Sequence, residues 1–282
     1  MNLHDKKKAA FDKIAKLYDK VRLSPPNEAV AWIISESNLC GEDTILEIGS
    51  GTGQATVLFA EAGFKVYCIE LGANLASILK ANCRAYPGVT IDVSAFEKWE
   101  PLGKKSFPLI ISVQAFHWLD TTIKYKKCHS LLRSNGYLSL IWTGWSNSNN
   151  EVVERFNDID VPGHEDTPLS DHGDLNHQRK MELEQSGYFT NIKYKIFPWT
   201  VSYQPNDFLK LLQTDCAYLM VGKEDQKLIT ESIQKKLISI EKKIDIQLET
   251  IVFLASPQKK KNKYSFRDLE NLNSTILGTK NI

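Results

Sequence analysis

Long apolar runs are missing from this 282-residue sequence. No stretch approaches the roughly 18 consecutive apolar residues that a membrane-spanning helix needs. Residues 1–16 carry positive charge with no apolar run behind them, so a secretion signal is not predicted. We therefore expect a protein without a membrane partner, located in the cytoplasm.

Cysteine is scarce, and no C-x-x-C pair occurs, which excludes the common zinc-ribbon and dithiol redox motifs. A stretch at residues 164–177 is rich in histidine and acidic residues, but its spacing matches no familiar ligand set. We expect a polar cover loop there and no metal site. The five scattered thiols are expected to be reduced: Cys40, Cys68, Cys83, Cys128 and Cys216.

A strong charge bias is also absent, since 35 Lys and Arg residues face 34 Asp and Glu residues. Six of the basic and two of the acidic residues fall in residues 258–282, which leaves the rest of the chain mildly acidic. Broad binding to a phosphate backbone is therefore disfavoured, and no nucleic-acid partner is expected. The basic tail is predicted to be solvated or partly disordered, with a weak anionic partner as the alternative.

The sequence has no internal repeat, and its main signal is an alternation of apolar strands with amphipathic helices. The pattern predicts strands at Thr44–Ile48, Lys65–Ile69, Val89–Val93, Leu109–Val113, Tyr137–Trp142, Lys193–Tyr203 and Leu248–Ala255. It predicts helices at Gly53–Ala62, Leu75–Cys83, Ile123–Leu132, Arg179–Ser186, Asp207–Leu219 and Lys227–Lys243, with Asn135-Gly136 ending the third of these. This alternation favours an α/β fold with a Rossmann-like, doubly wound, mostly parallel seven-stranded sheet.

A glycine-rich turn, E-I-G-S-G-T-G at residues 47–53, joins the first predicted strand to a helix. Glycines let a ligand approach the backbone closely, and N–H groups at a helix start are free to bond. Glu47 lies at the end of an apolar strand, where an unpaired carboxylate would be costly to bury. We expect it to have a cationic or donor partner.

Two later strand ends carry side chains suited to a nucleoside. Glu70 ends the second strand, where an acid can accept hydrogen bonds from both ribose hydroxyls. Phe96 and Glu97 follow the third strand and offer an aromatic edge and a polar acceptor. Because the glycine spacing is G-x-G-x-G rather than G-x-G-x-x-G, the turn favours a cofactor without a pyrophosphate.

Because of the glycine-rich turn and the residues at these strand ends, the segment from about Phe11 to Trp142 resembles class I S-adenosylmethionine-dependent methyltransferases of the methyltransferase type 11 group. The resemblance implies that the glycine turn holds the methionine end, Glu70 the ribose, and Phe96 and Glu97 the adenine. One departure is that Ser94-Ala95 stand where many relatives have an Asp for the adenine amine. The expected cofactor-binding residues are Glu47, Gly49, Ser50, Gly51, Gly53, Gln54, Glu70, Leu71, Phe96, Glu97, Gln114 and Tyr18.

A narrower likeness concerns the A-F-H-W stretch at 115–118, the Y-D-K-V-R stretch at 18–22, and segments 197–203 and 211–214. They resemble the trans-aconitate-methyltransferase-like branch, in which an aromatic residue and an arginine help to close the site. The spacing of Arg22-Leu23-Ser24-Pro25 departs from the usual form.

His117 is the candidate for chemistry, either as a general base or as a wall of the pocket. Tyr18 and Trp118 are expected wall residues that attract the sulfonium through their aromatic faces. Arg22 and Arg155 are candidates for recognising an acidic acceptor, although Arg22 pairing with Asp or Glu is an equal alternative. The expected substrate pocket is Trp118, Arg22 and Trp145.

The change to a polar composition after Trp145 predicts a helical and loop cap inserted after the fifth strand. We expect five parts: residues 1–40, a helical element that closes the site; 41–145, the S-adenosylmethionine-binding core; 146–247, a cap or lid with the sixth strand; 248–257, the closing strand; and 258–282, the basic tail.

Together these features predict a methyltransferase that acts on a small molecule, with O-methylation of a carboxylate or hydroxyl favoured. N- or C-methylation of another metabolite and a non-catalytic cofactor-binding protein are the alternatives. A nicotinamide-dependent oxidoreductase would need the dinucleotide glycine spacing. An RNA or protein substrate is disfavoured because no N-P-P-Y type motif follows the fourth strand. We expect a monomer or weak homodimer.

Overall fold

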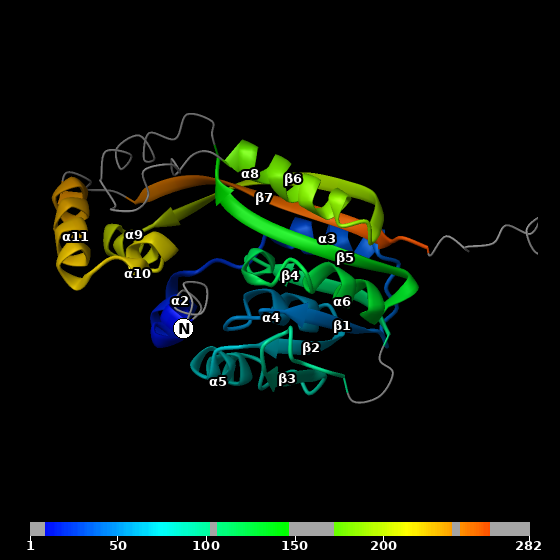
Figure 1. The fold of residues 1–282 in the computed structure, drawn as a ribbon. Helices are drawn as coiled ribbons and strands as arrows, with labels where there is room; N and C mark the ends of the chain where they lie inside the picture. The colour runs from blue at the N-terminus through cyan, green and yellow to red at the C-terminus, as the bar shows by residue number, and fades with distance from the viewer. Residues whose placement is uncertain (1–8, 102–105, 147–171, 239–242, 260–282) are drawn as a thin grey trace, which may run out of the picture.

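A seven-stranded sheet runs through the molecule, with helices on both of its faces (Figure 1). The computed structural model describes residues 9–101, 106–146, 172–238 and 243–259. The strands are β1 Thr44–Ile48, β2 Lys65–Glu70, β3 Val89–Val93, β4 Phe107–Val113, β5 Leu132–Trp145, β6 Phe189–Tyr203 and β7 Ile244–Pro257. The helices are α2 Ala15–Val21, α3 Asn27–Glu36, α4 Gln54–Glu61, α5 Ala73–Asn82, the short 3-10 helix η1 Phe116–Trp118, α6 Lys124–Leu131, α8 His172–Gln185, α9 Pro205–Leu212, α10 Cys216–Met220 and α11 Lys223–Ile238, and residues 9–13 are also helical.

The strand order is β3-β2-β1-β4-β5-β7-β6, and the first five of these strands pair in parallel. β7 runs antiparallel to both of its neighbours, which makes the sheet mixed. The seven predicted strands and the helix-covered sheet are thus confirmed. Chain order reverses between β1 and β4, and ligands of open α/β sheets bind at the carboxyl ends of strands at such a point.

Alternating side chains of the strands pack into two separate apolar layers. Ile45 of β1 packs in the layer that includes residues of α3, α4 and α5. Its neighbour Leu46 points to the opposite layer, shared with α6 and Leu183 of α8. Both strand residues are fully buried, and such burial stabilises the fold by about 2 kcal/mol per side chain. The sheet therefore forms a rigid floor for the edge where its strands end.

Among the helix boundaries that differ from the prediction, two have a visible local cause. α6 ends at Leu131 and β5 begins at the next residue, so Asn135-Gly136 does not end the helix. Gly136 lies in β5, where a Cβ atom would be only 2.9 Å from the carbonyl oxygen of Pro108. The helix expected at Asp207–Leu219 is two helices, α9 and α10, because Asp215 caps the second one by accepting from Ala217 N at 2.8 Å.

The cap helix predicted at Arg179–Ser186 corresponds to α8, and the other helices predicted for the cap follow β6, as their places in the sequence required. α9, α11 and the adjoining ends of β6 and β7 share a third apolar cluster, and α9 contacts α2. Only α8 lies between β5 and β6 in the described residues. The loop part of the cap, at residues 147–171, lies outside the described residues, so the cap after the fifth strand stays a prediction.

None of the helices in the described ranges has the length and apolar character needed to cross a bilayer. All five cysteines are free thiols, and Cys68, Cys83 and Cys128 are buried.

Candidate active site

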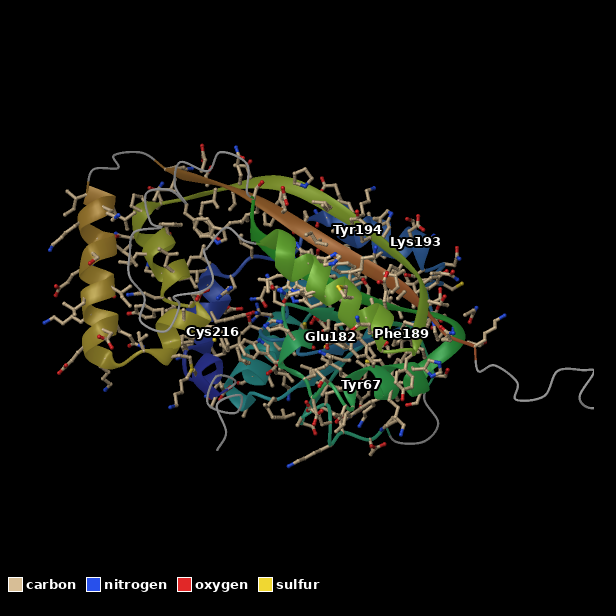
Figure 2. All side chains as sticks on the ribbon, turned by 45° about the horizontal axis from the view of Figure 1, so that its top comes forward. Tyr67, Glu182, Phe189, Lys193, Tyr194 and Cys216 are labelled. Carbon is tan, nitrogen blue, oxygen red and sulfur yellow. The ribbon has the colours of Figure 1, made fainter. Side chains whose placement is uncertain are left out.

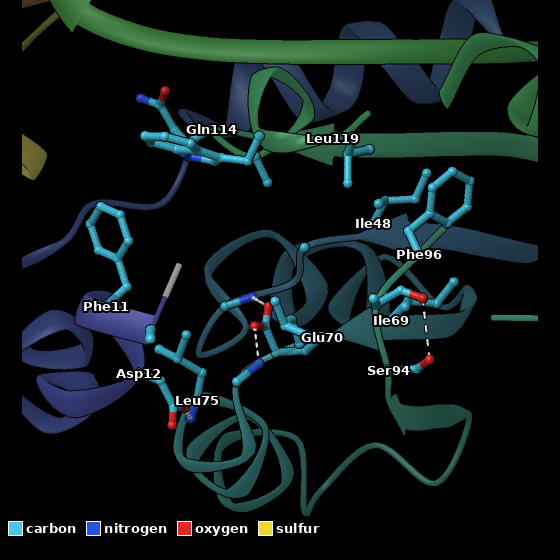
Figure 3. A pocket seen from close by; sticks show the side chains of 18 of the residues that line it. Phe11, Asp12, Ile48, Ile69, Glu70, Leu75, Ser94, Phe96, Gln114 and Leu119 are labelled. Atoms are coloured by element: carbon cyan, nitrogen blue, oxygen red, sulfur yellow. Dashed lines mark hydrogen bonds between the residues drawn. The ribbon is translucent and has the colours of Figure 1, made fainter. Parts of the chain in front are cut away.

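Two adjoining cavities open at the carboxyl ends of β1, β2 and β4. The larger cavity has a volume of about 570 Å³ and extends from the glycine-rich turn past the ends of β2 and β3 (Figure 3). The smaller cavity, of about 140 Å³, reaches from the same turn toward α9 and β7. Five residues line both: Tyr18, Gly49, Gly51, Val113 and Gln114.

Glu47 lines the smaller cavity, and only 1% of its surface is exposed. The Thr56 hydroxyl donates a hydrogen bond to Glu47 Oε2 at 2.5 Å, which is the donor partner expected from the sequence. Burial raises the pKa of Glu47 to about 8. No ion pair to Glu47 occurs among the described residues, so a cation entering the cavity would meet a buried acid with no cationic neighbour.

Glu70 ends β2 and forms part of the floor of the larger cavity (Figure 3). Its two carboxylate oxygens accept hydrogen bonds from Gly51 N and Gly72 N, each at 2.8 Å. Burial raises the pKa of Glu70, and these amide donors counteract the shift. Each carboxylate oxygen has a second lone pair, so the acid can still accept hydrogen bonds from a diol.

The glycine-rich turn brings the backbone against the cavity. At Gly49, with φ of 71°, a Cβ atom would overlap the Ala115 Cβ atom at 2.4 Å, so only glycine fits. Ser50 and Gln54 line the smaller cavity. Gly53 lines neither cavity. It precedes α4, and a Cβ atom there would be 2.7 Å from Leu79 Cδ1, which gives this glycine a packing role.

The far end of the larger cavity contains the residues predicted to flank an adenine. Phe96 is 2% exposed and lines this end with Glu97, whose carboxylate accepts from Asp120 N at 3.1 Å. Leu71 lines the rim and is 47% exposed. Ser94 also lines the cavity, at the position where the resemblance expected an Asp.

Three aromatic side chains line the larger cavity: Phe11, Tyr18 and Trp118. The ring of Phe11 lies 6.0 Å from Tyr18 and 6.2 Å from Trp118 between centroids. Asp12 fixes this segment, because its Oδ1 accepts from the first amides of α5, at Asn74 (2.8 Å) and Leu75 (3.1 Å). Sequence analysis missed Phe11 and Asp12 as site residues. The signal that could have found them is Gly72 at the N-cap of α5. A glycine has no side chain to cap the helix, so another residue must accept from its first amides.

Gln114 separates the two cavities. It has a left-handed backbone conformation with φ of 57°, which is uncommon for a residue other than glycine. Its amide Nε2 donates to the Thr143 carbonyl oxygen at 2.5 Å, and its backbone N–H donates to Ile141. The predicted contact of Gln114 with the cofactor region is therefore supported by its place in the wall.

Arg22 lines the smaller cavity and is held by one residue of the α9–α10 connection. Its Nε donates to Thr214 Oγ1 at 2.9 Å and its Nη2 donates to the Thr214 carbonyl oxygen at 2.6 Å. No ion pair of Arg22 occurs in the described part of the chain, so the alternative of an Asp or Glu partner is not what the structure has. Trp145 lines the same cavity, and its place in a substrate pocket stays a prediction. The apolar lining that sequence analysis missed is Leu23, Pro25, Leu211, Leu212 and Leu248.

His117 lines neither cavity. Its Nδ1 accepts from the indole N–H of Trp142 at 3.2 Å, and its ring lies 4.5 Å from that of Trp118, which does line the larger cavity. A role for His117 as a base stays a prediction.

Arg155 and residues 164–171 lie outside the described residues. Within the described ranges, no three His, Cys, Asp or Glu side chains gather as a metal site requires.

Known proteins resemble this chain in sequence and in fold. Residues 46–140 match the family described as "Methyltransferase domain". An uncharacterized methyltransferase of Mycobacterium tuberculosis is 26% identical over 155 residues, or 53% of this chain and 60% of that protein. One of Schizosaccharomyces pombe is 24% identical over 205 residues, or 70% of this chain and 74% of that protein. A 77-residue stretch is 34% identical to ribosomal RNA small subunit methyltransferase A of Syntrophus aciditrophicus, or 26% of this chain and 28% of that protein.

The fold has solved counterparts. Phosphoethanolamine N-methyltransferase 2 of Haemonchus contortus, in complex with phosphomonomethylethanolamine and S-adenosylhomocysteine, matches with a TM-score of 0.54 and 16% identity. The match covers 92% of this chain and 61% of that one. The narrower likeness to the trans-aconitate-methyltransferase-like branch stays a prediction. Residues 46–140 therefore match a methyltransferase domain, as predicted, and the chain shares its fold with a methyltransferase solved in complex with S-adenosylhomocysteine.

Proposed function

We propose that this protein transfers the methyl group of S-adenosylmethionine to an oxygen of a small acidic molecule. The observation that carries the proposal is the junction of the two cavities. Gly49, Gly51 and Gln114 line both, so a donor whose nucleoside lies in the larger cavity can extend its methionine end past the glycine turn toward Glu47, and it meets an acceptor in the rest of the smaller cavity.

The residues present fit this cofactor. Glu47 is a buried acid whose pKa is raised to about 8, and an ammonium group would supply the cation that it lacks. Glu70 offers carboxylate oxygens to a ribose diol, and the half of the larger cavity around Phe96 is apolar enough for a purine. When bound, the cofactor supplies an electrophilic methyl group on a sulfonium.

The protein's own contribution is positioning and the exclusion of water. The aromatic side chains of Phe11, Tyr18 and Trp118 line the larger cavity, and aromatic faces attract a sulfonium. Holding donor and acceptor in line removes much of the entropic barrier of a two-body reaction. A methyl transfer of this kind needs no covalent intermediate with the protein.

In the smaller cavity, which Glu47 and Asp215 also line, Arg22 is the side chain that favours an acidic acceptor. Arg22 is oriented by its two bonds to Thr214, and its guanidinium has further donors for a carboxylate. Leu211, Leu212 and Leu248 surround it with apolar surface. A carboxylate acceptor carries its own nucleophilic oxygen and requires no base, which agrees with the place of His117 outside both cavities.

The test is incubation of the purified protein with S-adenosylmethionine labelled in its methyl group and a panel of carboxylic acids, alcohols, amines and RNA. We expect label in the incubation with carboxylic acids, in the form of methyl esters that base hydrolyses. Label in amines, alcohols or RNA would replace our acceptor class, and the relative named for ribosomal RNA makes the RNA arm necessary. No labelled product in any arm, with no binding of the donor, would contradict the proposal.

Arg22→Met tests acceptor recognition. We expect the KM for an acidic acceptor to rise at least about tenfold, because the charge-assisted contact is lost, with little change in cofactor affinity. Lys16→Met changes an exposed cation on α2, the helix that Arg22 caps, and is the matched control, which should leave both values unchanged. Equal effects of the two variants would exclude Arg22 as the recognition residue.

A further inference from the structure

One face of α8 is directed at the wall of the larger cavity. Arg179, Glu182 and Leu183 are spaced at i, i+3 and i+4, so they share that face. Leu183 is 1% exposed and packs in the apolar layer that includes Phe116 and Leu119. Figure 2 labels Glu182 beside this helix.

Glu182 reaches the cavity wall through Lys124 of α6. Lys124 is 1% exposed, which is rare for a lysine, and its Nζ lies 2.7 Å from Glu182 Oε1. The same ammonium donates to the Phe116 carbonyl oxygen at 3.4 Å and lies 4.9 Å from the Phe116 ring. Without Glu182, a buried cation would lose its counter-charge at the point where it holds η1.

Arg179 reaches the same wall by a second route. Its guanidinium carbon lies 4.4 Å from the ring centre of Trp142, a cation–π contact with an indole that is 5% exposed. The indole N–H of Trp142 donates to His117, and the ring of His117 lies against Trp118. Burial lowers the pKa of Arg179 to about 10, in agreement with a desolvated cation.

Both routes end on η1. Trp118, the last residue of η1, and Leu119, which follows it, line the larger cavity, whereas Lys124, Arg179 and Glu182 line neither cavity. We propose that Lys124, Glu182 and Arg179 are positioning residues through which α8 sets the cofactor-facing wall formed by η1. The inference rests on the proposed function only in taking the larger cavity as the cofactor site.

The test measures binding of S-adenosylhomocysteine by calorimetry at a temperature well below the unfolding midpoint of every variant. We expect Glu182→Gln and Arg179→Met each to weaken binding about three- to thirtyfold, the range reported for residues that couple to a site without touching its ligand. Arg179→Lys retains a cation over Trp142 and should restore most of the affinity. Glu184→Gln changes an exposed acid on the same helix and is the matched control.

A purely structural role would lower the melting temperature while leaving affinity in the folded protein unchanged. Should Glu182→Gln not fold, the double variant Lys124→Met, Glu182→Leu replaces the pair by apolar side chains of similar size and removes the unpaired charge. It too should bind at least about threefold more weakly. If the wild type binds S-adenosylhomocysteine and these variants lose less than about threefold in affinity, the inference is wrong. Failure of the wild type itself to bind would instead contradict the proposed function.

Discussion

The Thr56 hydroxyl meets the Glu47 carboxylate across the buried space between β1 and α4, with Thr56 Oγ1 2.5 Å from Glu47 Oε2. This hydrogen bond and a longer one donated by the Cys68 thiol at 3.9 Å are a small compensation for a buried charge, and burial raises the pKa of Glu47 to about 8. The acid is therefore mostly protonated at neutral pH until a cation approaches it. This couples the charge of the site to its ligand.

Cofactor affinity should consequently depend on pH. A ligand ammonium favours the ionised form of Glu47, so binding lowers its pKa and releases up to about one proton at pH 7. Affinity should rise as pH increases from 6 toward the free-protein value of about 8. Calorimetry with S-adenosylhomocysteine in buffers of different ionisation enthalpy measures the released proton. Glu47→Gln should bind more weakly and without proton release, and an identical pH profile in that variant would exclude Glu47 as the source.

Glu70→Ala should weaken cofactor binding by more than about tenfold, because a charge-assisted contact to the ribose is lost. The substitution also removes the acceptor of Gly51 N and Gly72 N, so the glycine turn loses its tie to β2. Fluorescence or calorimetric titration with S-adenosylhomocysteine measures the loss. Glu28→Ala, at the exposed start of α3, is the control. Unchanged affinity would exclude our placement of the sugar.

Gly53→Ala should lower the free energy of unfolding by about 2 kcal/mol or more. The new Cβ atom would meet Leu79 Cδ1 at 2.7 Å and would be held at φ of 100°. Gly63→Ala is the matched control, because Gly63 has φ of 93° with open space around it and so reports backbone strain alone. Denaturant unfolding of both variants separates the overlap from the strain. Equal losses would mean that packing against α5 does not require glycine.

His117→Ala should reduce turnover only mildly and equally at all pH values. The Nδ1 lone pair already accepts from Trp142, and the ring supports Trp118 from outside the cavity. The measurement is kcat and KM from pH 6 to 9 once an acceptor is known. A large fall in kcat with a shifted pH profile would instead establish His117 as a base.

The sequence was informative where short-range pattern decides the structure. Glu47 and Glu70 were located because each lies within the last two residues of an apolar strand, and parallel strands end at one edge of the sheet. The contact of Arg22 with Thr214 spans 192 residues and depends on how α9 packs on α2. No local pattern encodes that packing. The same holds for Lys124 and Glu182, since a buried lysine resembles a solvated one in sequence.

The position of β7 has a consequence for how the sheet is completed. β7 lies between β5 and β6, and β6 has no other strand partner in the described part of the sheet. During synthesis, β5 therefore exposes an open edge, and β6 stays unpaired, until residues 244–257 have left the ribosome. Open strand edges are templates for pairing with other chains. The sheet therefore keeps an open edge at β5 until the last described strand docks.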